Sequence, residues 1–371
     1  MAIAQAQAQA QAKTQTPAQT RSRRRIFSGV KPTGHLTLGN YLGAVRRWVQ
    51  EDQHGADALF SVVDLHALTV EHDPARLRRL SRQAATLMLA SGLDPDRCTL
   101  FVQSHVDEHA RLSYLMECTA TDGEMRRMIQ YKEKTARERA GGGSVRLSLL
   151  TYPALMAADI LAYGTDEVPV GDDQAQHVEL ARVLAQRFNQ RYGAVFTVPR
   201  MTRPPVAARV MDLQDPTSKM GKSHAEAAGI VYLLDEEDTV RRKVMRAVTD
   251  SGSEVVYDRE AQPGVANLLE ILAACMDGLD GADGTDGTDG TDGKAPEELA
   301  GEYSSYGALK KDTAEAVVEL LRPIRARHAE LCADPSYVDG VLRAGAERAR
   351  GLARPRVDAA YEAVGLLPSA G

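Results

Sequence analysis

The sequence predicts an α/β fold in which a doubly wound, parallel-sheet (Rossmann-like) domain is followed by a smaller helical C-terminal domain. Short apolar runs alternate with longer helical patterns as far as about residue 224, which is typical of a parallel sheet covered by helices. Beyond residue 225 the strand signals fade and the pattern is mainly helical. A chain of 371 residues also exceeds the roughly 250 to 300 residues at which a single core stops growing, so two domains are expected.

The elements of the first domain follow one another in a regular order. Apolar runs predict buried strands at residues 26–30, 58–63, 99–102 and 168–170. Helical patterns lie after residue 40, after residue 73, up to about residue 139, over 151–163 and from about residue 173. Asp73-Pro74 marks a helix start, because Asp can accept hydrogen bonds from the free N–H groups and Pro fits the first turn.

Low-complexity segments flank and interrupt this pattern. Residues 1–21 begin with alternating Gln and Ala and lack the order of a secretion signal, so we expect a disordered tail; an organellar presequence is the alternative. The domain with the sheet is assigned to 22–224 and the helical domain to 225–371. A Thr-Asp-Gly repeat at 281–295 lacks the spaced ligands and closing Glu of a calcium loop, which favours a surface insertion.

Composition limits the classes of protein that the chain can belong to. No run approaches the roughly 18 apolar residues of a membrane span, so no membrane partner is expected. The four cysteines are far apart and form no Cys-x-x-Cys pair, which suits a reducing, cytoplasmic compartment. With a net charge of −6, a nucleic-acid partner would need a local basic surface. Arg241-Arg242-Lys243 is one candidate, and a solvated helix face is the alternative explanation.

A glycine-rich turn at residues 27–40, FSGVKPTGHLTLGN, lies between the first strand and the next helix. Glycine lets the backbone approach a ligand, and the free N–H groups of a helix N-terminus suit phosphate. The turn matches neither Gly-x-Gly-x-x-Gly nor the Gly-Lys-Ser/Thr of a P-loop, which argues against a nicotinamide enzyme or a P-loop kinase. A tight turn without a ligand remains the alternative.

A second motif, Lys219-Met220-Gly221-Lys222-Ser223, follows residues that predict a loop. Two cations on a mobile loop can close over a triphosphate and stabilise the charge that grows on departing pyrophosphate. Taken alone, such a pair of lysines is usually exposed surface.

Together the two motifs resemble the signature pair of class I aminoacyl-tRNA synthetases, His-x-Gly-His and Lys-Met-Ser-Lys-Ser. Thr37-Leu-Gly39-Asn40 stands in the first motif, and this variant, followed by Tyr41-Leu-Gly43-Ala, resembles the tryptophanyl-tRNA synthetases of bacteria. The resemblance covers about residues 26–280 and resumes after the insertion. It includes the segments 63–69, 130–134, 152–161 and 168–177.

The resemblance implies a ligase that activates L-tryptophan with ATP to tryptophanyl-adenylate and transfers it to tRNA(Trp). It further implies a cytoplasmic homodimer whose helical domain reads the anticodon, with no DNA partner. Mg²⁺ would be carried on the ATP phosphates, without a protein-bound metal. His105 and His109 are four residues apart, but Val106 stands where a zincin has Glu, which argues against zinc.

The resemblance also assigns roles to single residues. Tryptophan would contact Phe27, His66, Tyr152, Met156, Asp159 and Gln174. ATP would contact Lys31, Pro32, Thr33, Gly39, Asn40, Gly171, Asp172, Asp173, Val210, Lys219, Met220, Gly221, Lys222 and Ser223. The catalytic cations would be Lys134, Lys219 and Lys222.

Helical spacing independently singles out Asp159. Tyr152, Met156 and Asp159 are spaced i, i+4 and i+7, which places them on one face of a helix. A buried carboxylate needs a donor, and an indole N–H can only donate. A site built around that N–H can reject analogues lacking it by roughly ten-thousand-fold. An Asp paired to a donor from the protein is the alternative.

Two residues depart from the family pattern. Lys31 stands where the family usually has Gln, and Gly221 where it has Ser. We expect these to alter discrimination against tryptophan mimics such as indolmycin, as in an auxiliary, inhibitor-tolerant enzyme. The competing functions are a tyrosine-specific synthetase, a simple nucleotidyltransferase, and a non-catalytic paralogue that binds tRNA or a protein.

Overall fold

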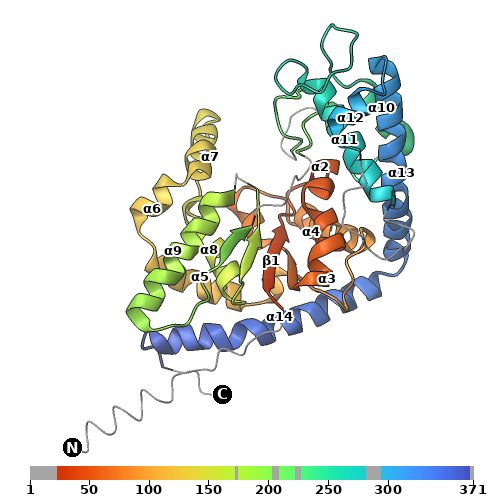
Figure 1. Ribbon diagram of the computed structural model, residues 1–371. Coiled ribbons are helices and arrows are strands. Elements are labelled where there is room, and N and C mark those ends of the chain that lie inside the picture. Colours follow the sequence, from red (N-terminus) through yellow and green to blue (C-terminus); the bar gives the residue numbers. More distant parts are fainter. Residues whose placement is uncertain (1–22, 172–173, 203–208, 222–226, 281–293, 368–371) are drawn as a thin grey trace, which may run out of the picture.

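The computed structural model describes residues 23–171, 174–202, 209–221, 227–280 and 294–367 (Figure 1). The predicted tail 1–21 and all but the last two residues of the 281–295 insertion lie outside these ranges.

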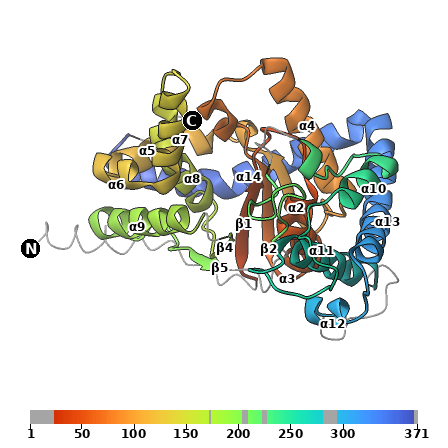
Figure 2. The same ribbon diagram turned by 90° about the horizontal axis from the view of Figure 1, so that it is seen from above.

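A sheet of five parallel strands forms the centre of the molecule, in the order β3-β2-β1-β4-β5 (Figure 2). The strands are β1 (Arg25–Val30), β2 (Asp57–Val62), β3 (Thr99–Val102), β4 (Glu167–Pro169) and β5 (Arg200–Thr202). The chain runs outward from β1 to β3 and then returns to the other side of β1 with β4. This reversal between β1 and β4 confirms the predicted doubly wound, Rossmann-like fold.

Four of the strands lie where apolar runs predicted them. β3 has the predicted bounds, and the others differ from the predicted ones by one residue at either end. β5 was missed, because a strand of three residues with an exposed Arg and two half-buried side chains carries no apolar run.

Helices cover both faces of the sheet. In chain order they are α2 (Leu38–Asn40), α3 (Gln53–Gly55), α4 (Pro74–Ala90), α5 (Glu108–Thr119), α6 (Asp122–Arg127), α7 (Ile129–Ala140), α8 (Leu147–Leu161) and α9 (Ala175–Tyr192). They continue with α10 (Glu237–Met245), α11 (Pro263–Asp280), α12 (Pro296–Ala300), α13 (Tyr306–Ala333) and α14 (Pro335–Ala363). Two π-helical segments, Tyr41–Val45 and Trp48–Asp52, join α2 to α3. The Asp73 side chain accepts from the Arg76 N–H at 2.6 Å, so α4 begins as predicted.

Alternate residues of β1, β2 and β3 face two separate apolar clusters, as the period of two requires. Ile26 and Phe60 belong to a cluster shared with α4, α10, α11 and α13. Phe27 and Leu59 belong to a second cluster, shared with α5, α8, α9 and α14. The sheet is therefore buried on both sides, which holds the carboxyl ends of its strands rigidly in place.

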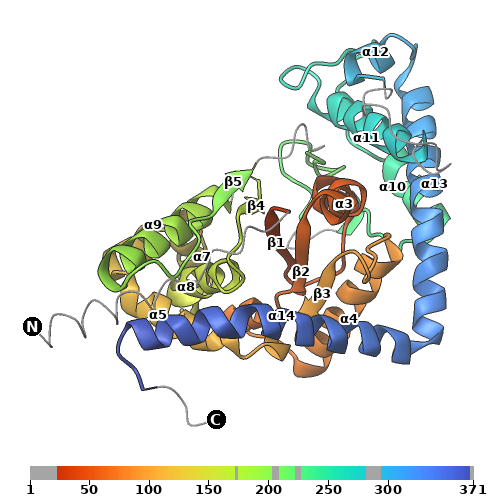
Figure 3. The same cartoon turned by 60° about the horizontal axis from the view of Figure 1, so that its bottom comes forward.

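The helices after residue 225 pack in two ways. α10 and α11 lie on α13, which also contacts α4. α14 turns back and runs along β3 and α5, beneath the sheet in Figure 3. The division at 224/225 stays a prediction, because the last helix shares one apolar cluster with the first domain. Within the described ranges, no helix is both long and apolar enough to cross a membrane.

Candidate active site

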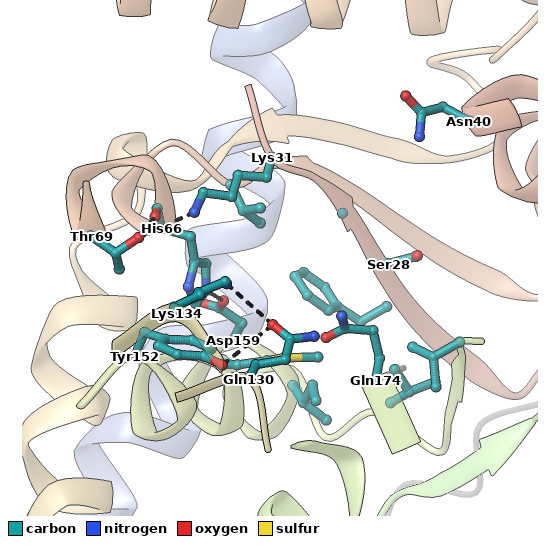
Figure 4. Close-up of a pocket in the computed structure, with 17 residues that line it drawn as sticks. Ser28, Lys31, Asn40, His66, Thr69, Gln130, Lys134, Tyr152, Asp159 and Gln174 are labelled. Carbon is teal, nitrogen blue, oxygen red and sulfur yellow. Dashed lines mark hydrogen bonds and ion pairs between the residues drawn. The ribbon is translucent and has the colours of Figure 1, made fainter. Parts of the chain in front are cut away.

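A cavity of about 400 Å³ lies where β1, β2 and β4 end at their carboxyl edge (Figure 4). Phe27, Ser28 and Gly29 come from β1, and Lys31 follows that strand. The strand order reverses between β1 and β4, and open α/β sheets bind ligands in the crevice at such a point. The fold therefore places a concave, partly apolar site where nucleotide-binding sheets have theirs.

All six residues predicted to contact tryptophan line this cavity: Phe27, His66, Tyr152, Met156, Asp159 and Gln174. The helical-face argument is confirmed for α8, because Tyr152, Met156 and Asp159 all reach the cavity from that helix. Lys134 of α7 and the two predicted ATP contacts Lys31 and Asn40 line it as well.

Asp159 accepts hydrogen bonds from three side chains of the protein, so the alternative that it pairs with protein donors describes part of its surroundings. Its Oδ2 accepts from His66 Nε2 at 2.7 Å. Its Oδ1 accepts from Gln103 Nε2 at 2.7 Å and from His109 Nδ1 at 2.6 Å. Helical spacing could not show these partners, because they are 50 or more residues away in the sequence.

The pairing keeps Asp159 charged in a dry environment. The side chain is 2% exposed. Burial raises the pKa of its carboxyl, but the charges and hydrogen bonds of His109 and His66 outweigh burial and hold the pKa below its ordinary value. A carboxylate offers about four acceptor positions, and the donors among the described residues occupy three. One position remains for a ligand donor.

Phe27 forms an apolar wall of the same cavity. Its ring stacks on that of Tyr163, with centroids 5.6 Å apart and planes inclined by 18°. Tyr163 is completely buried in the second apolar cluster, so the wall is supported from behind.

Two lysines give another part of the cavity a positive charge. Lys31 Nζ donates to Thr69 Oγ1 at 3.1 Å, and Lys134 Nζ donates to Gln130 Oε1 at 3.2 Å. Burial, and then the charge of Lys134, lower the pKa of Lys31 from 10.5 to about 8. Lys134 Nζ also lies 5.3 Å from the centre of the Tyr152 ring, a cation–π contact. This part of the cavity suits an anion.

The two signature segments meet beside the cavity. Met220 N–H donates to Val210 C=O at 3.0 Å, and Met211 pairs with Lys219 in an antiparallel bridge. A Cβ on Gly39 would lie 3.4 Å from Met220 Cβ and 3.5 Å from Val210 Cβ. The predicted ATP contacts Gly39, Val210 and Met220 are therefore neighbours, although they come from segments about 170 residues apart.

The remaining predicted residues lie around this centre or outside the described ranges. Pro32 is buried and Gly221 is half-buried, whereas Thr33, Gly171 and Lys219 are exposed; none of these five lines the cavity. Asp172, Asp173, Lys222 and Ser223 lie outside the described residues.

Several lining residues had no predicted role: Ser28, Gly29, Val63, Thr69, Gln130, Ile160, Val168 and Val170. Most of them are neighbours in sequence of predicted site residues, and this adjacency is the feature of the sequence that could have identified them. Gln103 and His109 had no such signal. Among the described residues, no group of three or more His, Cys, Asp or Glu side chains could hold a metal ion.

Comparison with known proteins agrees with this geometry. The family model of class I tRNA synthetases (W and Y) matches residues 19–322. Tryptophan–tRNA ligase 1 of Streptomyces avermitilis is 77% identical over 93% of this chain and 99% of its own length. The tryptophanyl-tRNA synthetase structure from Mycoplasma pneumoniae has a TM-score of 0.83 at 36% identity, covering 93% of this chain and 98% of that one. The one from Campylobacter jejuni, complexed with ADP and tryptophan, has a TM-score of 0.74 at 31% identity, covering 92% and 100%.

These matches extend over both the sheet and the helical region, and they agree with the motifs at residues 27–40 and 219–223. The chain therefore belongs to the class I tRNA synthetases, and within them to the tryptophan–tRNA ligases, which use ATP to activate tryptophan and join it to its tRNA.

Proposed function

We propose that the cavity holds L-tryptophan with its indole ring on Phe27 and its ring N–H directed at Asp159. The observation that carries this proposal is the buried Asp159 carboxylate, which lines the cavity and retains one acceptor position. An indole fits this position because it is a large apolar ring with one donor. Tyr152 and Gln174 then hold the substrate ammonium, and His66 contributes to the wall.

ATP lies beside tryptophan in this proposal, over Gly39, Val210 and Met220. Asn40 and Lys31 approach its phosphates, as do Pro32, Thr33 and the 219–223 segment. Gly171, Asp172 and Asp173 meet the ribose. Support comes from the closeness of Gly39 to Met220 and Val210, which brings the two motifs together beside the cavity. The Campylobacter jejuni structure is complexed with both ADP and tryptophan, which supports a nucleotide site beside one for the amino acid in this proposal.

The chemistry needs positioning and charge rather than proton transfer. A carboxylate oxygen of tryptophan forms a bond to the α-phosphorus, and the bond from that phosphorus to the β-phosphate oxygen breaks. Pyrophosphate leaves with the electron pair, and Lys134, Lys219 and Lys222 stabilise its charge. Mg²⁺ would be carried by the phosphates, because it keeps several waters and prefers phosphate oxygens to an all-protein site.

Exchange of labelled pyrophosphate into ATP tests this assignment when each amino acid is supplied in turn. We expect exchange with tryptophan alone. Exchange with tyrosine would favour a tyrosine-specific enzyme, and no exchange would favour a non-catalytic paralogue. Asp159→Asn should reduce exchange with tryptophan at least tenfold. The indole N–H would then face a side-chain amide, which donates as well as accepts, instead of a carboxylate, which only accepts. The control is Asp238→Asn on α10, whose side chain is 96% exposed.

We also propose a cytoplasmic homodimer whose helical region reads the anticodon of tRNA(Trp). Support comes from three exposed apolar side chains on α5, α7 and α8, since Tyr114, Ile129 and Leu147 expose 65, 59 and 75% of their surface. Cys98, Cys118 and Cys332 form no disulfide, which suits a reducing compartment. Sedimentation at increasing protein concentration tests the dimer.

Finally, we propose that Lys31 and Gly221 make this an auxiliary, indolmycin-tolerant enzyme. Lys31 lies in the cavity wall and brings an ammonium group to within hydrogen-bonding distance of Thr69. A charge in that place changes which tryptophan mimics the cavity accepts.

A further inference from the structure

Asp159 is the centre of a buried chain of polar side chains that extends away from the cavity. His66 borders the cavity, whereas Gln103, His109 and Tyr163 are all completely buried. The chain continues beyond His109, because its Nε2 lies 2.6 Å from the Tyr163 hydroxyl. Burying polar groups costs free energy unless their hydrogen bonds are made, so each member of this chain needs partners. Apolar side chains would fill the same space without that cost.

The orientation of Gln103 is fixed by the backbone. Its Oε1 accepts from the Leu65 N–H at 3.0 Å. The amide nitrogen must therefore point the other way, toward Asp159 Oδ1 at 2.7 Å. Gln103 can only donate to Asp159.

His109 also presents a donor to Asp159, and its other ring nitrogen contacts Tyr163. His109 Nδ1 lies 2.6 Å from Asp159 Oδ1, and a carboxylate is an acceptor only. If the neutral ring carried its proton on Nε2, the lone pair of Nδ1 would face a lone pair of Asp159 Oδ1, which is repulsive. A proton therefore lies on Nδ1, and in the neutral ring Nε2 accepts from the Tyr163 hydroxyl. A doubly protonated ring would still donate from Nδ1.

Tyr163 also supports the other contact proposed for the indole. Its ring stacks on Phe27, and its hydroxyl ends the chain that leads to Asp159. One buried side chain thus connects the apolar wall of the cavity with the acceptor group.

We propose that Gln103, His109 and Tyr163 are positioning residues that lock Asp159 as an acceptor-only group and so set the selectivity for amino acids with a ring N–H. The inference rests on the proposed function, in which Asp159 meets the indole. With Oδ1 occupied by two fixed donors, the carboxylate cannot rotate or accept a proton to suit another ring. A ring with sulfur or oxygen in place of the N–H leaves the remaining position of Asp159 unpaired, which is costly in a dry site.

The test compares tryptophan with benzothienylalanine, in which sulfur replaces the ring N–H. The measurement is the ratio of their kcat/KM values in pyrophosphate exchange. Tyr163→Phe removes only the hydroxyl and keeps the ring that stacks on Phe27. We expect it to lower the ratio by about threefold to tenfold, the effect of one buried hydrogen bond, mainly through a higher KM for tryptophan. The KM for ATP should stay constant.

His109 provides a second pair of variants. His109→Asn keeps an amide N–H close to the place of Nδ1 and should retain most of the selectivity, whereas His109→Leu should lose it. Tyr257→Phe is the matched control, because it removes a hydroxyl that donates to Glu270 at 2.8 Å, away from the cavity. It should leave the ratio unchanged.

The outcomes separate this inference from the function on which it rests. If Asp159→Asn abolishes the selectivity but Tyr163→Phe and His109→Leu leave it intact, the positioning role is wrong and the indole contact stands. If Asp159→Asn leaves the ratio unchanged, Asp159 does not meet the ring N–H and the proposed function fails as well. Should Tyr163→Phe not fold, the comparison of His109→Asn with His109→Leu decides the question.

Discussion

Lys31 and Thr69 are joined by a hydrogen bond of 3.1 Å in the wall of the cavity. The Thr69 hydroxyl in turn donates to the His66 C=O at 2.8 Å. The charge of Lys31 is therefore held at a fixed place, close to a residue proposed to contact the substrate ring. This arrangement leads to two predictions about Lys31.

The first concerns pH. The pKa of Lys31 is about 8, lowered by burial and then by Lys134, so the ammonium loses its proton as the pH rises above 8. If the positive charge binds a substrate anion, kcat/KM for tryptophan should fall above that pH, by up to about tenfold per pH unit. The side chain of the Lys31→Gln variant does not titrate in this pH range. Its kcat/KM should be lower at pH 7 and flat between pH 7 and 9.5, and a wild-type inflection that persists in this variant would contradict the assignment.

The second concerns indolmycin. Lys31→Gln removes the charge and restores the residue usual in the family, so the inhibition constant for indolmycin should fall, by about tenfold or more, the scale of one charged hydrogen-bond contact. Competitive inhibition of pyrophosphate exchange measures this. An unchanged inhibition constant would remove the case for an inhibitor-tolerant enzyme.

Asn40 stabilises a helix start and is also proposed to approach the phosphates of ATP. Its Oδ1 accepts from the Thr37 N–H at 3.1 Å, while its own N–H donates to Thr37 Oγ1 at 3.2 Å. Asn40→Asp keeps the acceptor but places a negative charge beside the proposed phosphates, so we expect unchanged stability and a KM for ATP raised about tenfold. Asn40→Ala should instead lower the free energy of unfolding by about 1 kcal/mol. Denaturant unfolding and exchange kinetics separate the two effects, and equal kinetics for both variants would argue against a phosphate nearby.

Gly345 and Gly351 of α14 form a matched pair for testing how the last helix docks. A Cβ on Gly345 would overlap the carbonyl oxygen of Leu100 in β3, whereas one on Gly351 meets nothing within 4 Å. Gly345→Ala should therefore destabilise the protein by about 1 to 3 kcal/mol. Gly351→Ala should stabilise it by roughly 0.5 to 1 kcal/mol, because alanine favours a helix. Urea unfolding measures both, and a neutral Gly345→Ala would mean that α14 does not sit tightly on β3.

Much of the fold could be predicted because its elements carry local signals. The run at 99–102 predicted β3 without error, and Asp73-Pro74 marked the start of α4. β5 has half-exposed residues and no such run, so only its pairing with β4 defines it. Local patterns describe what a segment can form by itself, and edge strands depend on their neighbours.

The sequence predicts those parts of the candidate site that lie close together along the chain, and misses contacts between distant segments. Helical spacing brought Tyr152, Met156 and Asp159 to one face, which the cavity confirms. The same spacing says nothing of His109, which reaches Asp159 from another helix. The sequence argues against His109 as a zinc ligand, and in the structure its Nδ1 contacts the Asp159 carboxylate. Long-range pairs of this kind are determined by the packing of α5 on α8, which no single segment encodes.

The position of α14 has a consequence for how the protein is made. β3 is at the border of the sheet, and α14 runs along it, with Arg348 donating to the Cys98 C=O at 3.3 Å. An uncovered strand of this kind readily pairs with another chain. Since α14 is synthesised after all five strands, the edge of β3 stays uncovered in a nascent chain until α14 has been made. Nascent chains on neighbouring ribosomes of one mRNA could then associate through their uncovered β3 strands. This tendency to aggregate ends once α14 has been synthesised and packs along β3.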